Sequence, residues 1–258
     1  MTDILITDFI IVVLIFIRII GVFSTAPVFG NRAIPIFAKI GLSLVISYIV
    51  FLTIDTSKIV VDQNIFAIAM FGAKELLTGI IMGFIINFVF WGISFAGFLI
   101  GFDMGLMMSE VMNPLDDTQG NVMGEILFYA AMMIFFIING HHYIITGVVS
   151  SFAAIPIGKY TINEPVINLL IRYSFMVFTI AVKIASPIMV SFFLVHLAEG
   201  IIAKVIPNIQ VFFVTQPIKI GLGLVVIIAV IPFYVLVVKY LLQGYEYQLL
   251  ELIRAMGA

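Results

Sequence analysis

The sequence predicts an all-α, polytopic integral membrane protein. Of its 258 residues, 63% are hydrophobic and only 10% are charged, whereas an ordinary soluble domain has roughly 25% charged residues. Apolar stretches of the roughly 20 residues that a helix needs to cross a bilayer recur along the chain. A water-soluble fold needs more charged residues than this on its surface. The surface of this protein therefore requires lipid or other apolar protein around it.

Charge and cysteine content exclude several other classes of protein. The net charge is −2, and Lys and Arg are scattered singly, so the sequence offers no basic patch for a nucleic acid. The chain has no cysteine, which excludes disulfides, thiolate catalysis and zinc–thiolate sites. We expect a single membrane-embedded domain that covers residues 1–258.

The first two apolar stretches predict helices over Ile4–Val22 and Ile36–Ile54, and charged residues follow the second. Acidic rather than basic residues precede the first stretch, so we expect a retained membrane helix rather than a cleaved signal peptide. The third block, from Ile65 to Phe102, is too long for one span. It is either one long tilted helix or a tight pair broken near Gly79–Gly83 or Gly92–Gly97.

The least apolar segment, Gly101–Gly124, is predicted to be a plug-like loop or a re-entrant segment. Asn113-Pro114 followed by two aspartates is typical of a turn. The next block, Ile126–Gly158, would reach about 50 Å as one helix, well beyond a hydrocarbon core of about 30 Å. A helical hairpin that turns at Asn139–His142 is the simplest solution.

The last part of the chain contains four predicted segments. Val166–Val195 is a helical block that contains Pro187, and Pro165 suits a helix start. His196–Lys219 is mixed in polarity and predicts two short elements broken at its prolines. Ile220–Val238 is the last uncharged span, and the polar tail Lys239–Ala258 has amphipathic spacing.

Charged residues inside the apolar blocks are candidates for buried or intersubunit ion pairs, because each costs roughly 2.5–3.5 kcal/mol on insertion scales. They are Arg18, Lys74, Glu75, Arg172, Lys183, Glu199 and Lys219. They either reach an interface or a neighbouring helix, or face a water-filled path or a partner subunit. Lys74 and Glu75 are adjacent and point about 100° apart on a helix, so at least one needs a partner elsewhere.

A cluster of methionines marks the candidate plug. A Met stripe is more often packing than anything else, but this one lies beside glycines and acids between two apolar blocks. Soft, unbranched side chains could seal a pore and still yield to a passing chain. The candidate pore residues are Met104, Met107, Met108, Glu110, Met112, Asn113 and Pro114.

No catalytic, cofactor or metal site is expected. The sequence contains no nucleophile elbow, zinc-protease motif or phosphate loop. The adjacent His141 and His142 diverge on a helix and have no other ligand within a turn, so a polar hairpin turn is the better interpretation. The residues therefore indicate a protein that is not an enzyme.

A set of weak motifs, in a specific order, resembles the FliR family of flagellar and type III secretion export-gate proteins across nearly the whole chain. The motifs include Arg18-Ile19-x-Gly21, Lys74-Glu75 with Gly79 and Gly83, Gly101 and Gly105 before Asn113-Pro114, Gly140-His141-His142, Pro187, Glu199-Gly200, Gln210-Val211-Phe212 and Pro217-x-Lys219. Family members often carry Met-Asn where this chain has Ile209-Gln210.

The resemblance implies one subunit of an export gate through which unfolded proteins pass. It implies assembly with the sister proteins FliP and FliQ, contact with FlhB, and a place in the bacterial inner membrane at the flagellar basal body. It also implies a spiral assembly in which several apolar helices face other subunits instead of lipid. Broken helices and inward charges also suit a small secondary transporter, although no paired halves or acidic ion site are evident.

Overall fold

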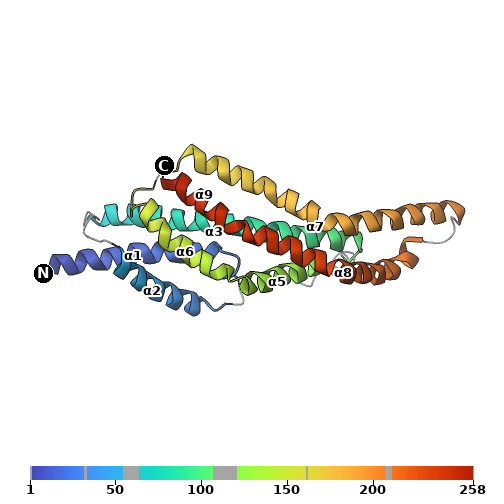
Figure 1. Cartoon of the computed structure of the whole chain (residues 1–258), viewed down its shortest axis with the longest axis horizontal. Coiled ribbons are helices and arrows are strands. Elements are labelled where there is room, and N and C mark those ends of the chain that lie inside the picture. The colour runs from blue at the N-terminus through green and yellow to red at the C-terminus, as the bar shows by residue number, and fades with distance from the viewer. Residues whose placement is uncertain are drawn as a thin grey trace. The chain divides into compact units, whose positions relative to one another are not determined.

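The computed structural model describes residues 2–31, 34–54, 64–106, 121–160, 162–206 and 211–257, and all regular elements in these ranges are helices. The described helices are α1 (Thr2–Thr25), α2 (Ile36–Thr53), α3 (Ile65–Asp103), α5 (Val122–Ile137), α6 (Gly140–Ala154), α7 (Glu164–Val205), α8 (Val211–Gln243) and α9 (Tyr245–Gly257) (Figure 1). The prediction of an all-α polytopic protein is therefore confirmed. By length and composition, five stretches of described helix could cross a membrane, and the bent pair α5–α6 would make a sixth.

The chain divides into two compact units that are not contiguous in sequence. Unit 1 contains Met1–Phe88, Asn139–Ser174 and Gln243–Ala258, and unit 2 contains Val89–Ile138 and Phe175–Leu242. The prediction of a single domain for the whole chain stays a prediction.

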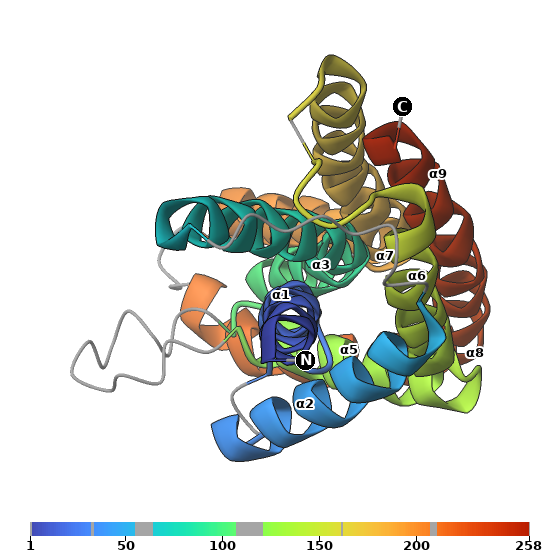
Figure 2. The ribbon, with the colours of Figure 1, turned by 90° about the vertical axis from the view of Figure 1, so that its left-hand side faces the viewer.

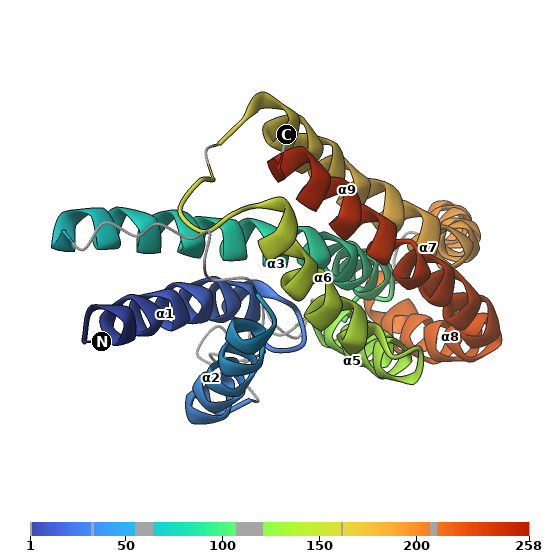
Figure 3. The ribbon, with the colours of Figure 1, turned by 60° about the vertical axis from the view of Figure 1, so that its left-hand side comes forward.

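In unit 1, α1 lies beside α2 and against the first part of α3, and α9 lies beside α6 (Figures 2 and 3). The packing of α1 on α3 depends on small residues. A Cβ on Gly79 would collide with the Arg18 carbonyl of α1, and a Cβ on Gly83 would come within 2.8 Å of the Val22 carbonyl. These glycines, four residues apart, let two helix backbones approach as they do in small-residue membrane interfaces.

The packing of α6 and α9 follows the amphipathic pattern of the polar tail. Tyr245, Leu249, Leu252, Ile253 and Met256 form the buried stripe of α9. Gly147 on α6 leaves the room that the Leu249 side chain occupies. The predicted polar tail is thus a helix from Tyr245 onward, while α8 extends the last span as far as Gln243.

In unit 2, the end of α3, together with α5, α7 and α8, forms an apolar core. Gly92 allows α3 to approach Ile180 on α7. A Cβ at position 92 would lie only 2.9 Å from the Ile180 side chain. The Tyr234 hydroxyl of α8 donates to the Leu127 carbonyl of α5 at 2.6 Å. The buried Tyr234 hydroxyl thereby has a partner on another helix, which stabilises the packing of α8 on α5.

Two sequence predictions about breaks are settled by these helices. The block from Ile65 is one long helix, α3, and not a broken pair, because its glycines provide close approach to α1 instead of a turn. The predicted break at Asn139–His142 is present, because α5 ends at Ile137 and α6 begins at Gly140, but the predicted hairpin is wrong: the two helices are bent by 72°, short of the reversal that a hairpin requires. Asn139 adopts φ 58°, and asparagine tolerates this left-handed conformation better than most residues.

The prediction of two short elements over His196–Lys219 was wrong. Helix α7 continues past His196 to Val205, and Pro217 lies inside α8. Pro207 lies outside the described residues. The polar side chains of this region lie on the surfaces where α7 and α8 face each other, and not in loops. Glu199 on α7, for example, contacts Lys219 on α8.

Candidate functional site

A buried polar network around Arg18 joins three helices and a loop of unit 1. Arg18 on α1 and Glu75 on α3 are both fully buried, and Arg18 Nε donates to Glu75 Oε2 at 2.6 Å. The guanidinium also donates from Nη1 to Ser151 Oγ at 3.1 Å and from Nη2 to the Ile155 carbonyl at 3.0 Å. It lies over the Phe152 ring, 4.1 Å from the centroid. A buried charge is tolerated when its donors are matched in this way.

The carboxylate of Glu75 is satisfied on both oxygens. Glu75 Oε1 accepts from the Gly158 backbone N–H at 2.8 Å, while Oε2 takes the bond from Arg18. Lys74 Nζ donates to the Gly158 carbonyl at 3.2 Å, so the two adjacent side chains hold the same glycine from both sides. Gly158 has φ +75°, and a Cβ there would press on the Phe71 ring. This position therefore requires glycine.

A second polar contact in unit 1 ties α9 to the start of α7. Tyr173 donates to Glu251 Oε2 at 2.6 Å, and Arg172 Nη1 lies 3.3 Å from Glu251 Oε1. Asn163 Nδ2 also donates to the Ala255 carbonyl at 2.7 Å. Arg172 is more than half exposed, so the Arg172–Glu251 pair itself contributes little. The partly buried hydrogen bond from Tyr173 is the stronger constraint.

Unit 2 holds a third polar cluster, between α7 and α8. Lys219 Nζ lies 2.8 Å from Glu199 Oε2, and only about 5% of the Lys219 side chain is exposed. His196 Nδ1 lies 3.2 Å from the same carboxylate oxygen and 3.4 Å from Lys219 Nζ. Three polar side chains thus face each other across two long apolar helices, which fixes the register of α7 on α8.

The two ends of the segment that contains the candidate plug are fixed to unit 2. Gln216 Nε2 on α8 donates to the Met104 and Gly105 carbonyls at 3.3 and 2.9 Å. At the other end, Asn121 caps α5 by accepting from Gly124 N at 2.9 Å, and it donates to the Ser94 carbonyl at 3.1 Å. Each end is therefore held by a side-chain amide.

Of the candidate pore residues, only Met104 is described, and it is buried against Gly223 of α8. Met107, Met108, Glu110, Met112, Asn113 and Pro114 lie outside the described residues, so their role stays a prediction. The buried-charge candidates are all described. The structure brings Arg18 to Glu75 and Glu199 to Lys219, places Lys74 against Gly158 and Arg172 against Glu251, and leaves Lys183 apart from the other charges.

Sequence reasoning missed several partners in these clusters. Ser151, Ile155, Gln216 and Glu251 are ordinary in type and lie far along the chain from the groups they bind. The only available signal was that Gln216 and Glu251 interrupt or follow apolar stretches. Within the described part of the chain, no three His, Asp or Glu side chains gather closely enough to hold a metal. The described ion pairs Arg18–Glu75, Arg172–Glu251 and Lys219–Glu199 each join two helices.

Comparison with known proteins gives a consistent result. Residues 9–245 match the family model described as bacterial export proteins, family 1. The chain is 31% identical over 230 residues to the flagellar biosynthetic protein FliR of Bacillus subtilis, with 88% of each chain covered. It is 26% identical over 216 residues to FliR of Escherichia coli, covering 84% of this chain and 82% of that protein. FliR of Aquifex aeolicus is 26% identical over 226 residues, with 87% of each chain covered. The chain therefore belongs to family 1 of the bacterial export proteins.

Proposed function

We propose that this protein is a structural subunit of the export gate of the flagellar or type III secretion apparatus. In this role it forms part of the channel through which unfolded substrate proteins pass. Membership of a bacterial export family and similarity to flagellar biosynthetic proteins support an export role that is structural and not catalytic.

The observation that carries the proposal is the apolar surface that the chain leaves uncovered. In the last candidate span, Phe213–Gly257, only 11% of the most apolar window is buried within the chain. Leu236 and Val225 on α8 are about two-thirds exposed, at 68% and 67%. Such a surface needs lipid or partner subunits, and the resemblance described above favours FliP, FliQ and FlhB as partners in a spiral assembly.

The charged clusters fit this role better than they fit a solute pathway. Arg18, Glu75, Glu199 and Lys219 are bound to one another or to backbone groups, so they hold long helices in register. We place the protein in the bacterial inner membrane, at the flagellar basal body, because that is where such a gate operates.

The segment Gly101–Asn121 is proposed to form the plug of the channel. Its methionine-rich, acid-containing composition supports this role, as does the fixation of its two ends by Gln216 and Asn121. Deletion of residues 107–120 should leave the complex assembled but make cells permeable to small ions or dyes. An unchanged ion barrier in an assembled complex would refute the plug.

Co-purification tests the proposed function itself. The tagged chain, expressed with the FliP and FliQ of its own organism and extracted in mild detergent, should carry both proteins through size-exclusion chromatography. Loss of the chain from that organism should abolish secretion of flagellar proteins into the medium. A chain that purifies alone as a monomer or homodimer and binds a small solute would instead identify the alternative, a small secondary transporter.

A further inference from the structure

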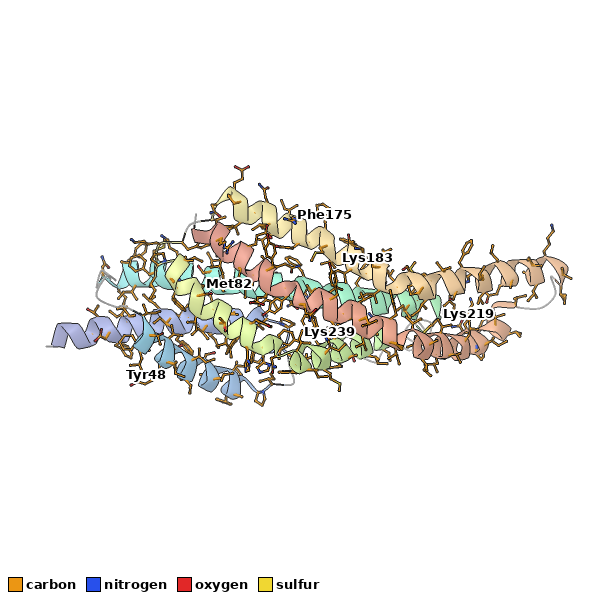
Figure 4. All side chains as sticks on the ribbon, in the orientation of Figure 1. Tyr48, Met82, Phe175, Lys183, Lys219 and Lys239 are labelled. Atoms are coloured by element: carbon orange, nitrogen blue, oxygen red, sulfur yellow. The ribbon has the colours of Figure 1, made fainter. Side chains whose placement is uncertain are left out.

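Lys183 is a charged residue of unit 2 that has no ion pair among the described residues. It lies near the middle of α7, its side chain is exposed, and within the described residues its ammonium makes no hydrogen bond, ion pair or ring contact. Figure 4 shows it on α7, away from Lys219, which has Glu199 as its partner. A lysine inside an apolar helix without a carboxylate is the more costly arrangement.

The nearest charges along α7 are too distant to neutralise Lys183. Arg172 and Glu199 lie about 16 and 24 Å away along the helix at ~1.5 Å per residue. The four-carbon stem of lysine does not span such distances. Between those two residues α7 carries no other charged side chain, so Lys183 is the single cation in a long apolar stretch.

Lys183 lines an open groove between α7 and α8. The groove has a volume of about 420 Å³ and is lined by Lys183 and Ser186 of α7 and by Phe233, Leu236 and Tyr240 of α8, among others. The other polar side-chain groups at this groove are the hydroxyls of Tyr240 and Ser186, and the Ser186 hydroxyl donates to the Lys183 carbonyl at 3.1 Å. One cation and two hydroxyls therefore border this groove, which is otherwise apolar.

The surface on either side of the groove is apolar and uncovered. Phe178, Val182 and Val190 on α7 are exposed, as are Phe233 and Leu236 on α8. Whatever covers this face excludes water from Lys183, and an ammonium removed from water requires a counter-charge. A carboxylate is the matching group, and the Tyr240 hydroxyl can donate to its second oxygen.

We propose that this groove receives a helix from a partner subunit, and that an Asp or Glu on that helix pairs with Lys183. The inference rests on the proposed function, because it requires a hetero-oligomeric assembly. A protein helix fits better than a lipid phosphate, because Lys183 lies in the middle of the charge-free stretch, far from the helix ends where headgroups gather. Charge complementarity then fixes the register of the incoming helix.

Substitution of Lys183 in the complete complex tests the proposal. Lys183→Met would leave the partner's carboxylate buried and unpaired, so recovery of the partner subunit with the tagged chain should fall about tenfold or more. Lys183→Arg keeps the charge and should retain most of the recovery. The matched control is Lys204→Met, because Lys204 is an exposed lysine in the last turn of the same helix. Recovery with Lys183→Met equal to that with Lys204→Met would overturn the proposal.

Photo-crosslinking identifies the occupant. With p-benzoylphenylalanine at Ser186 in the assembled complex, irradiation should give an adduct with a helix of another subunit that contains Asp or Glu. Lys183→Glu combined with replacement of that acid by Lys should restore recovery. Adducts with lipid alone would overturn the inference while the complex itself still supports the gate. Failure of the unsubstituted chain to bring any sister subunit would instead overturn the proposed function.

Discussion

Arg18 and Glu75, 57 positions apart in the sequence, meet at 2.6 Å in a place that no solvent reaches. Their contact joins α1 to α3, and each partner has further hydrogen bonds that complete its shell. Removal of one partner from such a pair costs more than the pair contributes, because the other is left buried with an unmatched charge. The stability of unit 1 is therefore expected to be sensitive to either residue.

Replacement of Glu75 by Gln should destabilise the protein by roughly 3–5 kcal/mol, the usual cost of a broken buried pair. Recovery of the purified complex and its apparent melting temperature in detergent should both fall. Glu246→Gln, an exposed position at the start of α9, is the control and should change neither. Undiminished assembly of the Glu75 variant would show that the charge of this pair is dispensable.

Gly79→Ala should destabilise the packing of α1 on α3. Alanine normally favours a helix over glycine by about 1 kcal/mol, but a methyl group at this position would meet the backbone of Arg18 and Val22. Overpacking of this kind costs about 1–3 kcal/mol. Gly41→Ala on α2 has nothing within 4 Å of the new methyl group and should be neutral or stabilising. Thermal unfolding of both variants distinguishes packing from helix propensity, and a stabilised Gly79 variant would contradict the close approach.

Tyr173→Phe should loosen α9 from the start of α7. The phenol donates to the Glu251 carboxylate at 2.6 Å, and a hydrogen bond to a charged group contributes about 1.5–3 kcal/mol. Limited proteolysis should cleave the C-terminal helix faster in this variant. Tyr247→Phe, which alters an exposed tyrosine on α9, is the matched control. Equal cleavage rates in the two variants would mean that the apolar stripe of α9 alone holds it in place.

Lys219 and Glu199 should show energetic coupling in a double-mutant cycle. Lys219→Met removes the cation that lies 2.8 Å from Glu199 Oε2 and leaves the carboxylate with His196. The double variant with Glu199→Gln should lose less stability than the sum of the single variants, with a coupling of about 0.5–3 kcal/mol. Strictly additive losses would indicate that the two side chains stabilise unit 2 independently.

The helices themselves were largely predictable, because helix length and apolar length must agree in a membrane. The break at Asn139 was predictable for the same reason, since the block around it exceeded any span, but the bend of 72° in place of a full reversal was not. The sequence alone could not decide whether the block from Ile65 forms one long helix or a broken pair. Glycine permits both a break and a close approach, and only the backbone of α1 against Gly79 and Gly83 decides between them.

The region around Glu199 shows where reading by polarity fails. The mixed polarity of His196–Lys219 predicts broken, short elements, but His196, Glu199 and Lys219 contact one another across the long helices α7 and α8. The same limit applies to the Arg18 network. The sequence showed that Arg18 and Glu75 each needed a partner, but the pairing depends on tertiary packing. The contacts with Ser151 and Gly158 also depend on the packing of α6 and on the positive φ of Gly158.

The wide sequence separation within the Arg18 network has a consequence for biogenesis. Synthesis proceeds from the N-terminus at about 5–20 residues per second, so Glu75 follows Arg18 by about 3–11 s and Ser151 follows by about 7–27 s. During that interval the first helix carries Arg18 without the partners that it has in the folded protein. An unpaired arginine disfavours transfer of a helix into lipid, so we expect α1 to become stable in the bilayer only after α3 has brought Glu75 to it.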